Sequence, residues 1–280
     1  MVEDGDGRVN TDAAPAISKD ALEELYTRYN RREMAHPDPI EFLYGYEDVR
    51  DREIVALVAS FLAYGRVAQI LKSVQRVLAQ MPEPAIFLER SSPDTLRRAF
   101  AGFKHRFTTA EALVALLVGA RRLIHLYGSL GAAFGAGLCD EHETVLPALS
   151  AFVCGFTDGT GAPQNSPLPS PAHGSACKRL NLFLRWMVRR DAVDPGGWVD
   201  VPPSKLLVPL DTHMLRISRA LRLTRRKRAD IRTAQEVSAA FRRFSPEDPV
   251  RYDFALTRLG IRRDADLDAF LADRLRLEAT

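Results

Sequence analysis

The chain reads Gly-Ser-Ala-Cys-Lys-Arg-Leu-Asn-Leu at residues 174–182 and Pro-Leu-Asp-Thr-His-Met at residues 209–214. The first stretch leads into a segment whose apolar residues recur at helical spacing, so Lys178 is predicted in the first turn of a largely buried helix. The second stretch predicts another helix that opens at Asp211, because aspartate is a favoured N-cap residue. A lysine and an aspartate, each held at the beginning of a helix, therefore decide how the chain is interpreted.

Helical periodicity dominates the rest of the sequence. The segment 51–62 is apolar nearly all round and predicts a buried central helix. Residues 128–137 are a break rich in small residues, 157–174 form a predicted loop, and no alternating segment makes a convincing strand. We therefore predict an all-α protein, with helices over 51–62, 67–80, 108–127, 145–156, 175–190, 211–223, 233–244, 249–260 and 267–277.

The composition is that of a soluble globular protein. The chain has 280 residues, of which 46% are hydrophobic and 27% charged. No apolar run approaches the roughly 18 residues of a membrane span, so we expect no membrane partner. The N-terminal residues are polar and lack the apolar core of a signal peptide. We predict that residues 1–18 are a disordered tail. Three scattered cysteines favour a reducing compartment, so we expect a cytoplasmic location.

The net charge of +3 hides an uneven distribution. Residues 178–243 hold 16 Lys/Arg and 6 Asp/Glu, a balance of +10, and the rest of the chain holds 23 and 30, a balance of −7. A basic face of this kind is typical of a protein that binds a polyanion. The alternative is a set of solvated arginines; the run Arg225–Arg228 in particular fits a phosphate contact and a solvated turn equally well.

Lys178 fits the chemistry of a Schiff-base nucleophile. Ser175 is the predicted N-cap of this helix, which places Lys178 in the first turn. The helix dipole disfavours a positive charge there, and partial burial disfavours it further. Both effects favour the neutral amine that such a nucleophile needs. The backbone N–H groups that follow Gly174 can also hold a phosphate. The alternative is a lysine whose stem covers apolar surface while its amine reaches water.

Asp211 has two interpretations of its own. As a helix cap it would contribute about 1 kcal/mol to stability. As a fixed anion it would also stabilise the positive charge that develops on a sugar when a glycosidic bond breaks, and it would assist deprotonation of the lysine or of an attacking water.

Taken together, these residues resemble the catalytic core of the helix-hairpin-helix DNA glycosylase superfamily. The matching positions are Lys178, Asn181 three residues later, and Asp211 within Pro209–His213. The separation 211 − 178 = 33 is longer than in endonuclease III and closer to that of the archaeal 8-oxoguanine glycosylases. The insertion that lengthens it is 191–208.

The resemblance implies a single domain over 19–280 with a cleft between two helical lobes. One lobe covers about 66–210, with a hairpin-like element near 170–190, and the N- and C-terminal helices form the other.

Over about 21–261 the chain is also similar to a bacterial family of unassigned function. Four segments carry that similarity: Phe61–Arg66, Lys178–Val188, Pro209–Ile217 and Tyr252–Ile261. Two features of the glycosylases are absent. The usual Leu-Pro-Gly-Val-Gly hairpin is replaced by Pro171–Ser175, and residues 262–280 lack the cysteines of an iron–sulfur loop, so we expect no cluster and no other cofactor. The segment Cys139–Glu143 matches no standard zinc spacing, and we expect no metal site.

The resemblance implies an enzyme, a DNA N-glycosylase that excises a damaged base, with or without abasic-site lyase activity. Its partner would be duplex DNA with a damaged base or an abasic site, and it would act as a monomer, associated with the nucleoid when bound. Two alternatives stay open: a non-catalytic DNA- or RNA-binding protein, and a helical interaction protein in which Lys178 and Asp211 are structural. The site residues expected on the first hypothesis are Lys178 and Asp211 for catalysis; Gly174, Ser175, Arg179, Thr212, His213 and Arg216 for DNA binding; and Tyr64, Arg66 and Trp198 for the base pocket.

Overall fold

The computed structural model describes residues 17–157 and 168–261, and it confirms a mostly helical protein. Within these residues no helix is both long and apolar enough to cross a membrane. Short 3-10 turns and one small hairpin, β1 (Lys104–His105) with β2 (Thr108–Thr109), complete the fold. The α-helices are α1 (Lys19–Tyr29), α2 (Val49–Phe61), α3 (Val67–Leu78), α4 (Pro84–Arg90), α5 (Pro93–Ala99), α6 (Ala110–Tyr127), α7 (Leu130–Gly135), α8 (Leu146–Gly155), α9 (Lys178–Val188), α10 (Thr212–Ala220), α11 (Ile231–Arg242) and α12 (Asp253–Ile261).

The structure differs from the sequence-based prediction at several elements, and helices α1, α4 and α5 occupy segments for which no helix was predicted. The expected break at 128–137 contains helix α7, because Ser129 caps it and Leu130 and Phe134, one turn apart, are both buried. The hairpin was not expected, since strands of two residues are too short to show an alternating pattern. The predicted tail up to residue 16, the central part of the predicted loop and the helix at 267–277 lie outside the described residues.

Helix α2 is a buried helix surrounded by other elements, as its apolar sequence predicted. Residues 53–61 are all buried, and the helix packs against α9, α3, α4, α7 and the 3-10 turn η2 (Pro39–Gly45). Asp48 caps its beginning by accepting a hydrogen bond from the backbone of Arg50 at 2.7 Å. A helix covered on every side in this way fixes the positions of the elements around it.

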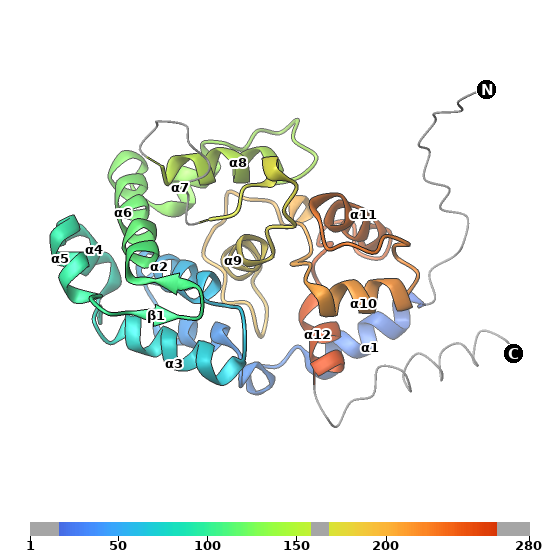
Figure 1. Cartoon of the computed structure of the whole chain (residues 1–280). Helices are drawn as coiled ribbons and strands as arrows, with labels where there is room; N and C mark the ends of the chain where they lie inside the picture. Colours follow the sequence, from blue (N-terminus) through green and yellow to red (C-terminus); the bar gives the residue numbers. More distant parts are fainter. Residues whose placement is uncertain (1–16, 158–167, 262–280) are drawn as a thin grey trace, which may run out of the picture.

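Helix α9 lies in the middle of the molecule between two groups of helices (Figure 1). Helices α2 to α8 lie on one side of it, and α1, α10, α11 and α12 lie on the other. The second group joins the two ends of the described chain, because α12 packs against both α1 and α10. The two motif segments of the sequence, the beginnings of α9 and α10, therefore meet near the junction of the two groups.

A buried glutamate joins three separate segments on the α2 side. Glu53 accepts hydrogen bonds from the backbone of Leu130 at 2.8 Å, from the backbone of Gly131 at 3.0 Å and from the indole of Trp198 at 3.0 Å. Burial raises the pKa of this carboxyl group, and the three donors oppose that shift. Glu53 thereby ties α2 to the start of α7 and to the chain that follows α9.

We expect Glu53→Ala to lower the free energy of unfolding by about 3 kcal/mol or more, because it leaves three buried donors without an acceptor. Chemical denaturation measures this change. Glu83→Ala is the matched control, since Glu83 is exposed and its side chain does not cap α4. Equal stability of the two variants would show that Glu53 does not join these segments.

Candidate functional site

Lys178 is the first residue of α9. The preceding residue, Cys177, has a left-handed backbone with φ +47° and makes no side-chain cap. The prediction that Ser175 caps this helix is wrong, because Ser175 is in an extended segment that bridges to Asp230. Its hydroxyl instead accepts a hydrogen bond from the backbone of Cys177 at 3.2 Å. The helix therefore begins abruptly, with Lys178 at its open end.

Asn181 holds the chain that enters α9. It is fully buried, and its side-chain amide donates a hydrogen bond to the carbonyl of Ala176 at 3.0 Å. This contact explains an asparagine one turn after Lys178 without any role in chemistry, because it fixes the loop that leads into the helix.

The structure brings Asp211 and Lys178 together. One carboxylate oxygen of Asp211 accepts hydrogen bonds from the backbone of His213 and of Met214, both at 2.9 Å, and so caps α10. The other oxygen lies 3.8 Å from the amine nitrogen of Lys178. Both side chains are partly exposed, at 29% for the lysine and 37% for the aspartate, so the pair is open to a ligand. Asp211 thus serves as a cap and as the neighbour of the amine at the same time.

The pair lies in the wall of a cleft of about 1060 Å³. Helices α9, α10 and α12, the beginning of α3 and the segment before η2 contribute to the lining. A volume of this size accommodates a nucleotide-sized ligand. The lining residues are His36, Pro37, Asp38, Pro39, Ala63, Tyr64, Gly65, Val67, Ile70, Lys178, Arg179, Leu182, Arg185, Pro209, Asp211, His213, Asp253, Phe254, Thr257 and Arg258.

Arg179 is held in the cleft wall by the end of α2. Its guanidinium donates a hydrogen bond to the carbonyl of Phe61 at 2.6 Å and lies 5.2 Å from the ring centres of both Phe61 and Tyr64. Burial lowers the pKa of this guanidinium. The resemblance placed Arg179 among the residues that bind DNA, and the structure holds its guanidinium against Phe61 and Tyr64 in the cleft wall.

A buried carboxylate lies near the lysine–aspartate pair. Asp253, the first residue of α12, lines the cleft and forms an ion pair with Arg185 of α9. Burial raises its pKa and the Arg185 charge opposes that shift, with smaller effects from Asp211 and Lys178. No local pattern singles out Asp253, because its contacts are with residues far away in the chain. It was seen only as part of the segment Tyr252–Ile261.

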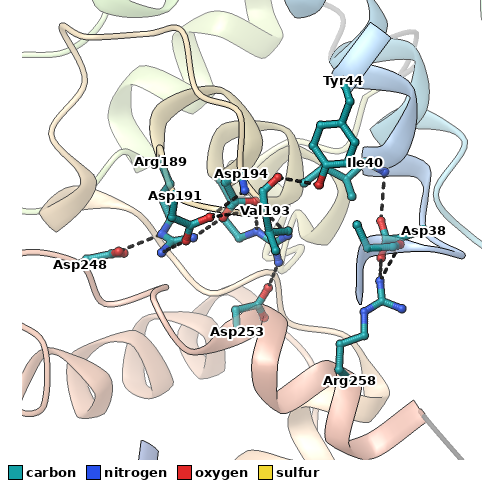
Figure 2. Close-up of polar contacts among 12 residues, drawn as sticks. Asp38, Ile40, Tyr44, Arg189, Asp191, Val193, Asp194, Asp248, Asp253 and Arg258 are labelled. Atoms are coloured by element: carbon teal, nitrogen blue, oxygen red, sulfur yellow. Dashed lines mark hydrogen bonds and ion pairs between the residues drawn. The ribbon is translucent and has the colours of Figure 1, made fainter. Parts of the chain in front are cut away.

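Behind the cleft wall, buried ion pairs fix the second half of α9 (Figure 2). Arg189 contacts Asp191, with 2.8 Å between the charged atoms, Asp248, also at 2.8 Å, and Asp194. Asp194 also contacts Arg185 at 3.1 Å, so one carboxylate lies between two guanidinium groups. These pairs hold α9 at a fixed depth and keep Lys178 at the cleft.

The remaining residues expected to bind DNA lie at or near the surface. Thr212, His213 and Arg216 are exposed on the first turns of α10, and His213 also lines the cleft. Gly174 is exposed and Ser175 half-buried, after the 3-10 turn η4 (Pro171–His173) that stands in place of a hairpin.

Of the three residues expected in a base pocket, only Tyr64 lines the cleft. Arg66 is exposed at the start of α3, outside the cleft lining. The prediction that Trp198 belongs to a base pocket is wrong, because this residue is only 6% exposed. Its ring stacks on Phe134, and its indole N–H donates a hydrogen bond to Glu53. The neighbouring glycines suggested an open loop, but this loop folds back on α9, where the backbone N–H of Trp198 donates to the carbonyl of Met187 at 2.8 Å.

In the part of the chain that the structure describes, no three or more His, Cys, Asp or Glu side chains are grouped so that they could hold a metal ion. At the segment Cys139–Glu143, the imidazole of His142 accepts a hydrogen bond from the backbone of Cys139 at 3.3 Å. The amine of Lys205 donates to the carbonyls of Cys139 and Asp140. The His142 contact is local, and the two Lys205 contacts tie this segment to a distant part of the chain.

The chain belongs to a family described as "Protein of unknown function (DUF2400)", whose model matches residues 38–262. The match spans more than half of the chain and includes α3, α9, α10 and α12, the helices that contribute to the cleft lining. Neither the curated proteins nor the solved structures include a significant match. Membership of this family fixes no activity, so the chemistry of the site has to be argued from its own residues.

Cys177 offers a test of how tightly the chain is held beside Lys178. Its thiol is buried, and burial raises its pKa to about 11. The thiolate is the reactive form, so at pH 8 we expect Cys177 to react with iodoacetamide at least tenfold more slowly than the exposed Cys139 and Cys154. Its rate should still be rising at pH 10. Mass spectrometry of each cysteine measures this, and equal rates in the native protein would contradict the buried position.

Proposed function

We propose that this protein is a DNA N-glycosylase that excises a damaged base with Lys178 as nucleophile. The observation that carries the proposal is the 3.8 Å pair of Lys178 and Asp211 in the wall of a large cleft. The fold we propose is the two-lobed helix-hairpin-helix glycosylase arrangement, with α9 between the lobes. The support for it is the placement of both motif residues at helix beginnings that face the same cleft.

In the proposed reaction the neutral amine of Lys178 attacks C1′ of the deoxyribose. A nitrogen–carbon bond forms, the glycosidic bond breaks, and the base leaves with the bonding electron pair and then takes up a proton. Loss of a proton from nitrogen and opening of the sugar ring give an imine, which water hydrolyses or which eliminates the 3′ phosphate and nicks the strand. The carboxyl group of Asp211, fixed at the beginning of α10, stabilises the positive charge that develops on the sugar.

The surroundings of the pair suit a nucleotide that has been rotated out of a duplex. Such a nucleotide needs a pocket that receives the base and a cationic surface for the flanking phosphates. The cleft supplies apolar and aromatic lining for the first. The cationic surface is supplied by exposed basic residues on α10, whose first turn lines the cleft, and on the segment after it. These residues are Arg216, Arg219, Arg222, Arg225, Lys227 and Arg228.

We expect wild-type protein mixed with abasic-site DNA and borohydride to give a covalent adduct, because borohydride reduces an imine to a stable amine. Lys178→Gln removes the nucleophile and should abolish the adduct. Lys72→Gln is the matched control, since Lys72 is an exposed lysine on α3 that does not line the cleft. Denaturing gel electrophoresis measures the adduct, and an undiminished yield from Lys178→Gln would exclude this residue as the nucleophile.

The same experiment separates the enzyme from a binding protein with the same fold. If wild-type protein binds the DNA with an affinity that falls steeply with salt, yet gives no adduct and releases no base from any damaged duplex, the non-catalytic alternative holds. If it neither binds nor reacts, DNA is not the partner.

We expect Asp211→Asn to lower the single-turnover rate of base release by about 10² or more, the scale seen when one fixed electrostatic group is removed from a site. Asparagine caps a helix about as well as aspartate, so the melting temperature should change by only a few degrees. Asp230→Asn is a matched control, because Asp230 caps α11 but does not line the cleft. Full base-release activity in a folded Asp211→Asn protein would contradict a catalytic role for this carboxylate.

A further inference from the structure

The β1–β2 hairpin carries an aromatic ring into solvent. Its strands pair in the register Lys104 with Thr109 and His105 with Thr108, so residues 106 and 107 form a two-residue turn. Phe107 in this turn is 85% exposed, the most exposed aromatic side chain among the described residues. A phenylalanine at this exposure contributes little to the core, and its ring is available for contact with a ligand.

The turn is fixed rigidly against the edge of the cleft. The hydroxyl of Tyr64 donates to the carbonyl of His105 at 2.8 Å and accepts from the backbone of Thr108 at 3.0 Å. Both bonds join a cleft-lining residue to the strands that flank the turn. Arg106 has a left-handed backbone with φ +49°, which is uncommon for a residue with a side chain. A two-residue hairpin turn requires a positive φ of this kind, so the turn itself accounts for the conformation of Arg106 and presents residues 106 and 107 at its tip.

Arg106 connects Phe107 with the interior of the cleft. Its guanidinium lies 5.7 Å from the ring centre of Phe107 and 6.0 Å from that of Tyr64. The side chain lies so close to Gly65 that a methyl group there would be 2.7 Å from it. The guanidinium of Arg179 also lies near the ring centre of Tyr64, at 5.2 Å. Aromatic and cationic side chains thus alternate from the surface into the cleft, a pattern suited to stacked bases and phosphates.

We propose that Phe107 stacks on the bases of the bound duplex and fills the gap left when a nucleotide enters the cleft. The partner is DNA with an unstacked or missing base. The exposed cations Lys104 and Arg106 beside the ring match the charge of the flanking phosphates. The apolar ring gains contact only where bases are separated, because the gap offers it two aromatic faces that water covers poorly. An intact duplex offers no such gap, so Phe107 favours damaged DNA over intact DNA.

This inference rests on the proposed function in that it takes DNA as the ligand of the cleft, but it does not depend on the reaction. The test therefore uses a duplex with a tetrahydrofuran abasic analogue, which lacks the reactive C1′ hydroxyl and forms no imine with Lys178. Binding is measured by fluorescence anisotropy at fixed salt, against an intact duplex of the same sequence. A 2-aminopurine next to the analogue reports stacking by its fluorescence.

We expect Phe107→Ala to weaken binding to the abasic duplex about tenfold or more, the scale of one lost base–aromatic stack, and to weaken binding to the intact duplex by less than about twofold. The 2-aminopurine signal that wild-type protein induces should be lost as well. Phe107→Tyr keeps an aromatic ring and should restore both. Because the ring is exposed, the melting temperature of each variant should match that of the wild type.

Leu126→Ala is the matched control, since Leu126 is 69% exposed on α6 and does not line the cleft. Equal binding of Phe107→Ala and wild type to the abasic duplex would overturn the role of Phe107 and leave the lysine chemistry standing. An equal loss on intact and abasic DNA would also overturn it, since the ring would then act as a general contact. A wild-type protein that binds neither duplex would overturn this inference and the proposed function together.

Discussion

Two buried arginines at the C-terminal end of α9 constrain the rest of this structure. Arg185 lies in the last turn of α9, and Arg189 directly follows the helix. Each has a side chain that is 4% exposed, and a charge at that depth has to be neutralised by partners close to it. Removing one partner of a buried ion pair typically costs about 3–5 kcal/mol, because the remaining charge stays without compensation. The carboxylates come from segments far apart in the chain: Asp191 and Asp194 directly after α9, Asp248 before α12, and Asp253 at its beginning. The network therefore joins the middle of the chain to its C-terminal helices.

The same network reaches the N-terminal helices through two tyrosines. Tyr26 of α1 donates to the carboxylate of Asp191 at 3.0 Å, and Tyr44 of η2 donates to the carbonyl of Val193 at 2.8 Å. Burial raises the pKa of Tyr26 to about 12, so its hydroxyl stays protonated and remains a donor at physiological pH. In the loop after α9, the indole N–H of Trp198 donates a hydrogen bond to the carboxylate of Glu53 of α2. Both helix groups are therefore connected to α9, and the position of Lys178 at its open end is set by contacts deep in the protein.

Asp211 caps a helix with the same side chain that we propose acts in the chemistry. The oxygen that caps α10 holds the carboxylate in place, and the other oxygen faces the amine of Lys178. The orientation of the charge is thus fixed by a helix before any ligand binds, which is the condition under which an electrostatic group is most effective. Asp253, buried nearby and paired with Arg185, links this pair to the ion network behind the cleft wall.

The sequence alone determined the helical class, the central position of α2, and the placement of Lys178 and Asp211 at the beginnings of two helices. These properties follow from local periodicity and capping, which neighbouring residues decide. Its errors arose where a distant contact overrules the local pattern. Ser175 does not cap α9, since it bridges to Asp230, and Trp198 is buried against Glu53 and Phe134. Only the tertiary structure placed Asp253 at the cleft and Phe107 at its edge, because both positions depend on contacts between segments far apart in the chain.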